Sequence, residues 1–290
     1  MTGVTEAAEL GIEVVGVGRY TGGGVGNSFR PLPATNCIIS RMLVLSLDTT
    51  TRAGSCALVR DAHVVREQGG DASRDQAERL PGEVAALLAR ESVALPEVDC
   101  LAVATGPGSF TGLRVGIATM QGLAMAAGKS LIGVSAFDAL ERLSGVTNRE
   151  RPGVTATQAR APVGSSYVPG ATRVAAWIDA WRGDVFAAMY EDGRDVEAPV
   201  VAHPEDLLVR LKGKATVFIG AGAARNEDLI RAALGETAWL ADPVSPLLAG
   251  AIATMAGEAF RAGQRPPPHA IRPIYVRRAD TEPVRSAGRV

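Results

Sequence analysis

The stretch MLVLSLD at residues 42–48 decides the fold, because an almost wholly apolar run ends there in a carboxylate. Such a run predicts a buried β-strand. The stretch VAAWID at residues 174–179 ends in the same way, and in both places a short turn leads to a second apolar strand, over residues 53–60 and 185–190. Alternating helices and strands follow each pair. This order of elements, present twice, predicts a duplicated α/β architecture.

The composition changes sharply outside these elements. Residues before Met42 contain a glycine run at 22–24 and no sustained apolar period, and residues 145–172 combine three prolines with repeated serine and threonine. Stretches of this kind predict loops or unstructured chain. We therefore expect an unstructured leader or mis-assigned start at 1–41, a first half at 42–144, a flexible insertion at 145–172 and a second half at 173–290.

Local signals predict the individual helices. Ser73 and Gln76 have the spacing of a capping box in front of an apolar helical period. The stretch Ser109–Ala127 predicts a long helix capped by its first residue, and Ser245–Gly263 predicts another whose cap is followed by proline. Further strands are predicted at 99–105, 130–135 and 215–220, and further helices at 136–143, 204–211 and 226–234.

The charge balance excludes a protein held on nucleic acid by bulk charge. Thirty Lys and Arg residues against 31 Asp and Glu residues leave a net charge of −1, although a local basic patch stays open. The basic residues near the C-terminus suit either RNA phosphates or a solvated strand edge. They are Arg272, Arg277, Arg278 and Arg285.

Cysteine spacing and hydropathy indicate where in the cell the protein is expected. Three cysteines at no ligand-like spacing exclude a zinc cluster and a disulfide framework, so we expect reduced thiols and a cytoplasmic location. The sequence has no run of 18 uninterrupted apolar residues, and its N-terminus lacks the order of a signal peptide. We therefore expect no membrane span.

The turn after the first strand is a candidate ligand site. Asp48 is followed by Thr49 and Thr50, and a carboxylate in this place suits a hydrated Mg²⁺, while hydroxyls and amides suit phosphate. The alternative is a turn whose side chains only satisfy the backbone. The residues themselves leave both interpretations open.

The second half supplies only part of a matching site. Asp179 stands at the equivalent position, but bulky Trp181 and Arg182 follow it where a phosphate cradle needs glycine. Gly220 and Gly222, after a strand, suit either a close approach to adenosine or a plain strand-to-helix turn. A nucleotide site formed by both halves would therefore have phosphate-binding residues on one side only.

The densest motif is GPGSFTGLRVG at residues 106–116. It is neither a Walker A loop nor a dinucleotide fingerprint. Gly112 and Gly116 lie within the predicted helix, where each costs about 1 kcal/mol relative to alanine. Close approach of another backbone offsets such a cost, and that backbone belongs either to this chain's own sheet or to a partner helix.

The sequence lacks the common motifs of hydrolytic enzymes. The sequence contains no His-x-x-x-His or His-Glu-x-x-His pair and no Gly-x-Ser-x-Gly elbow. We therefore expect no catalytic residue and no resident metal.

Four stretches together resemble one known family. They are LDTT at 47–50, GPGSFTGLRVG at 106–116, IDAWRGDVF at 178–186 and RPIYVRR at 272–278. They resemble the TsaB family, also called YeaZ, the dimerisation subunit of the bacterial tRNA threonylcarbamoyladenosine machinery. The resemblance runs from Met42 to Glu282 without the insertion.

This resemblance implies an actin/Hsp70/sugar-kinase-like fold with two duplicated ribonuclease-H-like halves. It also implies a catalytically inert subunit that binds the transferase TsaD through helices of its first half, helps to recruit the ATPase TsaE, and forms a homodimer when alone. The chain then meets tRNA through the complex, where TsaD modifies the adenosine beside the anticodon. No intrinsic cofactor is expected, and ATP or ADP with Mg²⁺ is expected only at the complex interface.

The sequence departs from this pattern in two places. The metal-holding histidine pair of TsaD has no counterpart in Ser73–Glu78, and Trp181 stands where the family usually has arginine. We expect the partner face to consist of the apolar stripe of the helix at 109–127 together with the helix around residues 80–88. Its expected residues are Leu80, Val84, Leu87, Phe110, Gly112, Leu113, Gly116, Ile117 and Met120.

Two rival functions follow from the same residues. Asp48 and Asp179 suggest an independent actin-like ATPase or kinase. A peptidase is the weaker rival, because it requires a metal or nucleophile constellation that the sequence does not display.

Overall fold

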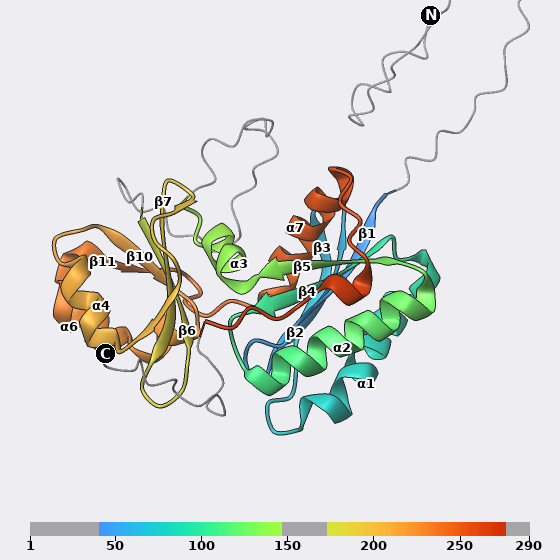
Figure 1. Cartoon of the computed structure of the whole chain (residues 1–290), viewed down its shortest axis with the longest axis horizontal. Helices are drawn as coiled ribbons and strands as arrows, with labels where there is room; N and C mark the ends of the chain where they lie inside the picture. The colour runs from blue at the N-terminus through green and yellow to red at the C-terminus, as the bar shows by residue number, and fades with distance from the viewer. Residues whose placement is uncertain (1–40, 147–172, 277–290) are drawn as a thin grey trace, which may run out of the picture. The chain divides into compact units, whose positions relative to one another are not determined.

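A computed structural model describes residues 41–146 and 173–276 (Figure 1). The expectations for the leader, for nearly all of the insertion and for Arg277, Arg278 and Arg285 lie outside these residues. In the described part, no helix combines the length and the apolar character that a bilayer crossing requires.

The first sheet has the order β3-β2-β1-β4-β5. Strands β1, β2 and β3 form an antiparallel meander, whereas β1, β4 and β5 run parallel. The strands are β1 (Leu43–Asp48), β2 (Ser55–Arg60), β3 (His63–Gly69), β4 (Cys100–Gly106) and β5 (Ser130–Ser135).

The second sheet repeats this arrangement in the order β11-β10-β6-β7-β8, and β9 also pairs with β7. Strands β6 and β7 are antiparallel, and β6, β10 and β11 are parallel. The strands are β6 (Arg173–Asp179), β7 (Val185–Glu191), β8 (Arg194–Asp195), β9 (Val200–Ala202), β10 (Thr216–Ile219) and β11 (Ala238–Leu240). The chain thus has the duplicated α/β architecture that the order of elements predicts, with the ribonuclease-H-like halves and actin-like fold that the family resemblance implies.

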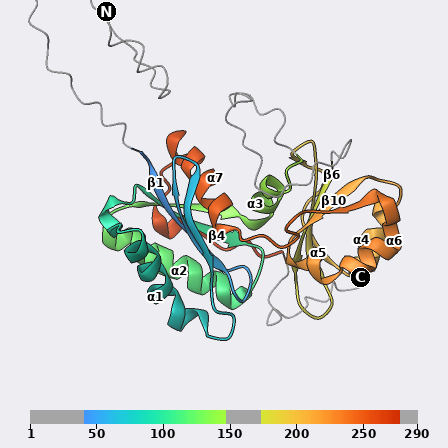
Figure 2. The ribbon, with the colours of Figure 1, turned by 180° about the vertical axis from the view of Figure 1, so that it is seen from behind.

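The helices cover both faces of the first sheet (Figures 1 and 2). Helices α1 (Gln76–Arg90) and α2 (Phe110–Ala127) pack on one face, and α3 (Ala136–Leu143) and α7 (Ala249–Arg261) pack on the other. The second sheet carries α4 (Pro204–Leu211), α5 (Ala221–Arg225) and α6 (Glu227–Leu234), and short 3₁₀ helices lie at Leu95–Glu97, Gly235–Thr237 and Pro268–Ala270 (η3).

The apolar run of β1 is explained by burial on both faces. Leu43, Leu45 and Leu47 pack under α1 and α2, whereas Val44 packs on the opposite side, toward α7. A strand buried on both faces loses the apolar–polar alternation of a half-exposed strand.

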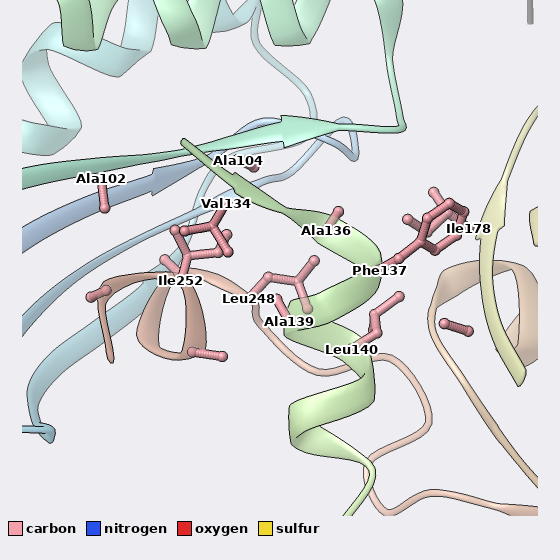
Figure 3. Close-up of a cluster of buried hydrophobic side chains, with 14 of the residues drawn as sticks. Ala102, Ala104, Val134, Ala136, Phe137, Ala139, Leu140, Ile178, Leu248 and Ile252 are labelled. Atoms are coloured by element: carbon pink, nitrogen blue, oxygen red, sulfur yellow. The ribbon is translucent and has the colours of Figure 1, made fainter. Parts of the chain in front are cut away.

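One core joins the two sheets (Figure 3). Phe137 and Leu140 of α3 pack with Ile178 of the second sheet and with Leu248 and Ile252 at the start of α7. Helix α7 belongs to the second half by sequence, yet it packs on the first sheet. A buried hydrogen bond fixes it there, because the Ser46 hydroxyl donates to the carbonyl of Ala249 at 2.6 Å.

Two predicted helix starts are wrong. Helix α7 begins at Ala249 and not at Ser245, because its first amide donates to the hydroxyl of Ser55, which is remote in sequence. The capping box at Ser73 is also absent, since its hydroxyl donates to Asp71 and α1 begins only at Gln76.

Candidate functional site

The glycines of the 106–116 motif pack directly against the turn between β1 and β2. A Cβ atom on Gly108 would lie 2.5 Å from the carbonyl oxygen of Thr50, and one on Gly112 would lie 2.6 Å from that of Thr49. A Cβ atom on Gly116 would overlap the Thr49 hydroxyl. The close approach predicted from these glycines is therefore made within the chain.

The turn is also held by a buried arginine that the sequence analysis missed. Arg79 of α1 is 3% exposed, and its Nη2 donates to the carbonyls of Arg52 at 2.8 Å and Ala53 at 2.5 Å. Its Nη1 pairs with Glu83 at 2.5 Å. Gln76 adds a bond from its side-chain amide to the carbonyl of Thr51. The only signal in the sequence is an arginine beside the apolar stripe of α1.

Asp48 is 3% exposed, and its Oδ1 accepts a hydrogen bond from the Thr50 amide at 2.9 Å. Burial raises the pKa of this carboxyl above its ordinary value. The hydroxyls of Thr49 and Thr50 are buried, and neither has a hydrogen-bond partner among the described residues. The carboxylate of Asp48 thus satisfies a backbone amide of its own turn, whereas the two buried hydroxyls do not take part in this bonding.

The N-terminus of α7 is a natural anion site, but two side chains of this protein accept hydrogen bonds from its first amides. The Ala249 amide donates to the Ser55 hydroxyl at 3.1 Å, and the Gly250 amide donates to a carboxylate oxygen of Glu67 at 2.8 Å. Burial, followed by the charge of nearby Asp48, raises the pKa of Glu67. Two of the N–H groups that would attract a phosphate are thus already used.

The turn after β6 is closed in a similar way. Asp179 accepts a hydrogen bond from the Trp181 amide at 2.9 Å and pairs with Arg225 at 2.8 Å. Trp181 and Arg182 have φ values of 58° and 55°, a left-handed conformation that glycine adopts more readily. The turn thus carries two bulky residues in the left-handed conformation where a glycine-rich turn would have none.

The second glycine pair serves packing within this half. A Cβ atom on Gly220 would overlap the carbonyl oxygen of Trp177, and one on Gly222 would lie 2.9 Å from the carbonyl carbon of Trp177. These glycines let α5 approach β6 closely, so the plain strand-to-helix turn accounts for them.

A cleft of about 150 Å³ lies between the halves. Of the residues predicted for a nucleotide site, Asp48, Thr50 and Gly220 line it, whereas Thr49, Asp179 and Gly222 do not. Pockets for molecules of nucleotide size are roughly 300–1,000 Å³. Because the cleft is small and the first two amides of α7 beside it are used, its residues do not fit a nucleotide with Mg²⁺.

Metal ligands do not gather elsewhere in residues 41–146 and 173–276. These residues contain no group of three or more His, Cys, Asp or Glu side chains placed to bind a metal ion. Cys56 and Cys100 are free and buried, and burial raises the pKa of the Cys56 thiol to about 11.

The predicted partner face requires correction. Most of its side chains pack into the chain's own core beneath α1 and α2, because the apolar face of a surface helix normally covers its own sheet. Gly112 and Gly116 face the turn at Thr49, and only Phe110 is exposed, at 40%. The buried residues are Leu80, Val84, Leu87, Leu113, Ile117 and Met120.

The opposite face of the same two helices is exposed and carries small apolar residues. We call it the α1–α2 outer face. Met125 is 71% exposed, and the one charged residue within 81–89 and 115–126, Glu83, is partly buried and paired with Arg79. Its residues are Pro81, Gly82, Ala85, Ala86 and Ala89 on α1, and Ala118, Gly122, Met125 and Ala126 on α2.

Known proteins resemble the chain in sequence. The family model "TsaD: tRNA N6-adenosine threonylcarbamoyltransferase" matches residues 59–161. The chain is 33% identical over 191 residues to the tRNA threonylcarbamoyladenosine biosynthesis protein TsaB of Escherichia coli, covering 62% of this chain and 72% of that protein. It is 30% identical over 251 residues to protein ML0378 of Mycobacterium leprae, covering 83% of this chain but only 56% of the relative's length.

A solved structure gives the same assignment. YeaZ from Pseudomonas aeruginosa superposes with a TM-score of 0.59 at 29% sequence identity, covering 81% of this chain and 99% of that one. Sequence and structural comparison thus agree with the four stretches and the duplicated fold, and the chain belongs to the TsaB (YeaZ) family.

Proposed function

We propose that this chain is a non-catalytic assembly subunit of the complex that makes threonylcarbamoyladenosine in tRNA. It pairs with the transferase TsaD, and the pair helps to recruit TsaE. Family membership supports this proposal, and one observation of the structure carries it, the exposed and uncharged α1–α2 outer face.

The outer face suits a partner that presents helices. Alanine and glycine are short, so the backbone of a second helix pair can approach closely and pack ridges into grooves. Exposed apolar residues gathered on two neighbouring helices are typical of an interaction site. When TsaD is absent, the same face joins two copies of this chain as a homodimer.

The misfit between the cleft and a nucleotide supports the non-catalytic role. In this proposal the chain has no cofactor of its own, and ATP or ADP with Mg²⁺ binds only where the chain meets its partners. It works in the cytoplasm and meets the substrate tRNA through the complex. An independent ATPase or kinase has less support, because Asp179 is paired with Arg225 and the amides at the start of α7 are used.

Charge substitutions on the outer face test the pairing. We expect Ala85→Arg and Gly122→Arg to reduce co-purification with TsaD at least tenfold, while each variant keeps the thermal unfolding midpoint of the parent within a few degrees. Val209→Arg is the matched control, since Val209 is exposed on α4, away from this face. Undiminished co-purification of both outer-face variants would refute the proposal.

Two measurements on the isolated chain address the rivals. Calorimetry with Mg-ATP should give no binding heat, and tight binding with turnover would instead establish an ATPase or kinase. Light scattering should show a dimer for the parent chain and a monomer for Ala85→Arg. A dimer that survives this substitution would place the homodimer contact elsewhere.

A further inference from the structure

A second surface follows α2 on the side of the C-terminal segment, residues 264–276 (Figure 1). Gln121 of α2 fixes this segment, since its side-chain amide donates to the carbonyls of Pro268 at 2.9 Å and Ile271 at 3.2 Å. The Ile274 amide donates to the carbonyl of Thr105 in β4 at 2.7 Å. The segment is therefore held against the first half over its length.

Three side chains form a stacked cluster where this segment passes the start of α2. The guanidinium carbon of Arg114 lies 3.9 Å from the centroid of the Phe110 ring, and its Nε donates to the Tyr275 hydroxyl at 2.9 Å. The two ring centroids are 5.1 Å apart, and their planes are inclined by 35°. Phe110 is nevertheless 40% exposed and Tyr275 44% exposed. The rings are thus fixed in place while part of each meets solvent.

The two segments that carry this cluster have charges of one sign. Residues 100–137 and 259–276 contain no aspartate or glutamate, although the whole chain has 31 acidic residues. The cations of these two segments include Arg114, Lys129, Arg265 and Arg272. A chain with a net charge of −1 therefore concentrates positive charge on the helix and the segment that carry the exposed rings.

We propose that this surface binds single-stranded RNA directly, with bases stacked on Phe110 and Tyr275 and a phosphate bound by Arg114. Exposed aromatic rings beside arginine are the usual platform for unpaired bases. Nε of Arg114 is used by Tyr275, whereas no acceptor among the described residues takes a hydrogen bond from its two terminal nitrogens. These two nitrogens match the oxygens of a phosphate.

A protein partner is the alternative occupant, and the charges favour RNA over it. A polyanion pairs with the Arg114 guanidinium without needing a matched carboxylate, and its bases supply flat apolar faces for the rings. The proposal goes beyond the assembly role, in which the complex brings the tRNA. Only the choice of a tRNA-derived probe rests on that role.

The test measures the fluorescence anisotropy of two labelled RNAs, an anticodon stem-loop and an unstructured oligouridylate, with the purified full chain. We expect binding that weakens markedly between 50 and 200 mM salt. Tyr275→Ala and Arg114→Ala should each weaken it roughly fivefold or more, in keeping with one lost stacking or phosphate contact. Ultraviolet crosslinking of the parent chain should attach the RNA to the peptides that contain Phe110 or Tyr275.

Trp239→Ala and Arg231→Ala are the matched controls, because both residues are exposed in the second half, on β11 and α6. Both should bind RNA like the parent chain. Equal RNA binding by all variants, or crosslinks elsewhere, would overturn the proposal. So would variants that bind RNA normally but lose TsaD, since the surface would then be a protein interface. Loss of RNA binding with intact TsaD pairing supports the surface independently of the outer face.

Discussion

Thr49 and Gly116 touch across 67 residues of sequence: the Thr49 hydroxyl occupies the space that any side chain on Gly116 would need. The turn at the end of β1 and the glycine motif of α2 are therefore two sides of one packed unit. The motif that most strongly suggested a partner contact is instead the surface on which the chain's own turn rests.

Gly116→Ala tests this contact. The added methyl group has to displace Thr49, so we expect the free energy of unfolding to fall by about 1–3 kcal/mol. Gly122→Ala is the control on the same helix, because a Cβ atom there would meet open space. That variant should be neutral or up to about 1 kcal/mol more stable, since alanine favours the helix. Urea unfolding of both variants decides the matter, and equal stabilities would contradict the packing.

Arg79→Met should destabilise the fold by roughly 2–4 kcal/mol, because it removes the buried guanidinium that donates to the carbonyls of Arg52 and Ala53 and pairs with Glu83. Arg90→Met, at the exposed end of the same helix, should change stability by no more than about 0.5 kcal/mol. Thermal and urea unfolding measure both effects. A mild effect at Arg79 would show that the turn keeps its shape without the guanidinium.

Stability should depend on pH through Asp48 and Glu67. Burial raises the pKa of both carboxyls in the folded state above their ordinary values of 3.8 and 4.5. The folded chain then binds protons more readily than the unfolded chain, so this stabilisation is complete below those values and is lost as pH rises through the raised pKa values.

Asp48→Asn and Glu67→Gln keep a hydrogen-bond acceptor but remove the charge. We expect each to become more stable relative to the parent chain as pH rises above 4, which a series of urea titrations would show. Asp228→Asn, at an exposed site on α6, is the surface control. A constant difference for the two buried sites would contradict this account.

Tyr190→Phe removes a hydrogen bond that links the second sheet to α3. The Tyr190 hydroxyl lies 2.9 Å from Oδ1 of Asp138, and burial raises the pKa of the tyrosine, so it donates as the neutral phenol. We expect a loss of about 1–2 kcal/mol in the free energy of unfolding. Tyr275→Phe is the control at an exposed position, and a loss of the same size there would make the effect nonspecific.

The sequence predicts this fold well where the cause is local. The continuous apolar run of β1 predicts a strand buried on both sides, and Ser109 caps α2 by accepting from the Gly112 amide at 3.2 Å. The order of elements predicts the duplication. In each case the deciding residues are neighbours in the chain.

The candidate site is predicted less well, because the contacts that determine it join residues far apart in the sequence. Periodicity identifies the apolar face of α2 but not what covers it, and the sheet covers it rather than a partner. The start of α7 depends on Ser55, and the glycines of α2 depend on Thr49, neither of which a local pattern reveals. The sequence does not predict the α1–α2 outer face, because alanine and glycine give no strong hydrophobic signal.

The core shared by the two sheets has a mechanical consequence. Phe137 and Leu140 pack against both halves, so a hinge rotation of one half would separate side chains that are now in contact. Such a separation exposes apolar surface at about 25 cal/mol per Å². The shared core therefore opposes opening of the cleft between the two sheets, because opening would transfer buried apolar side chains of α3 to water.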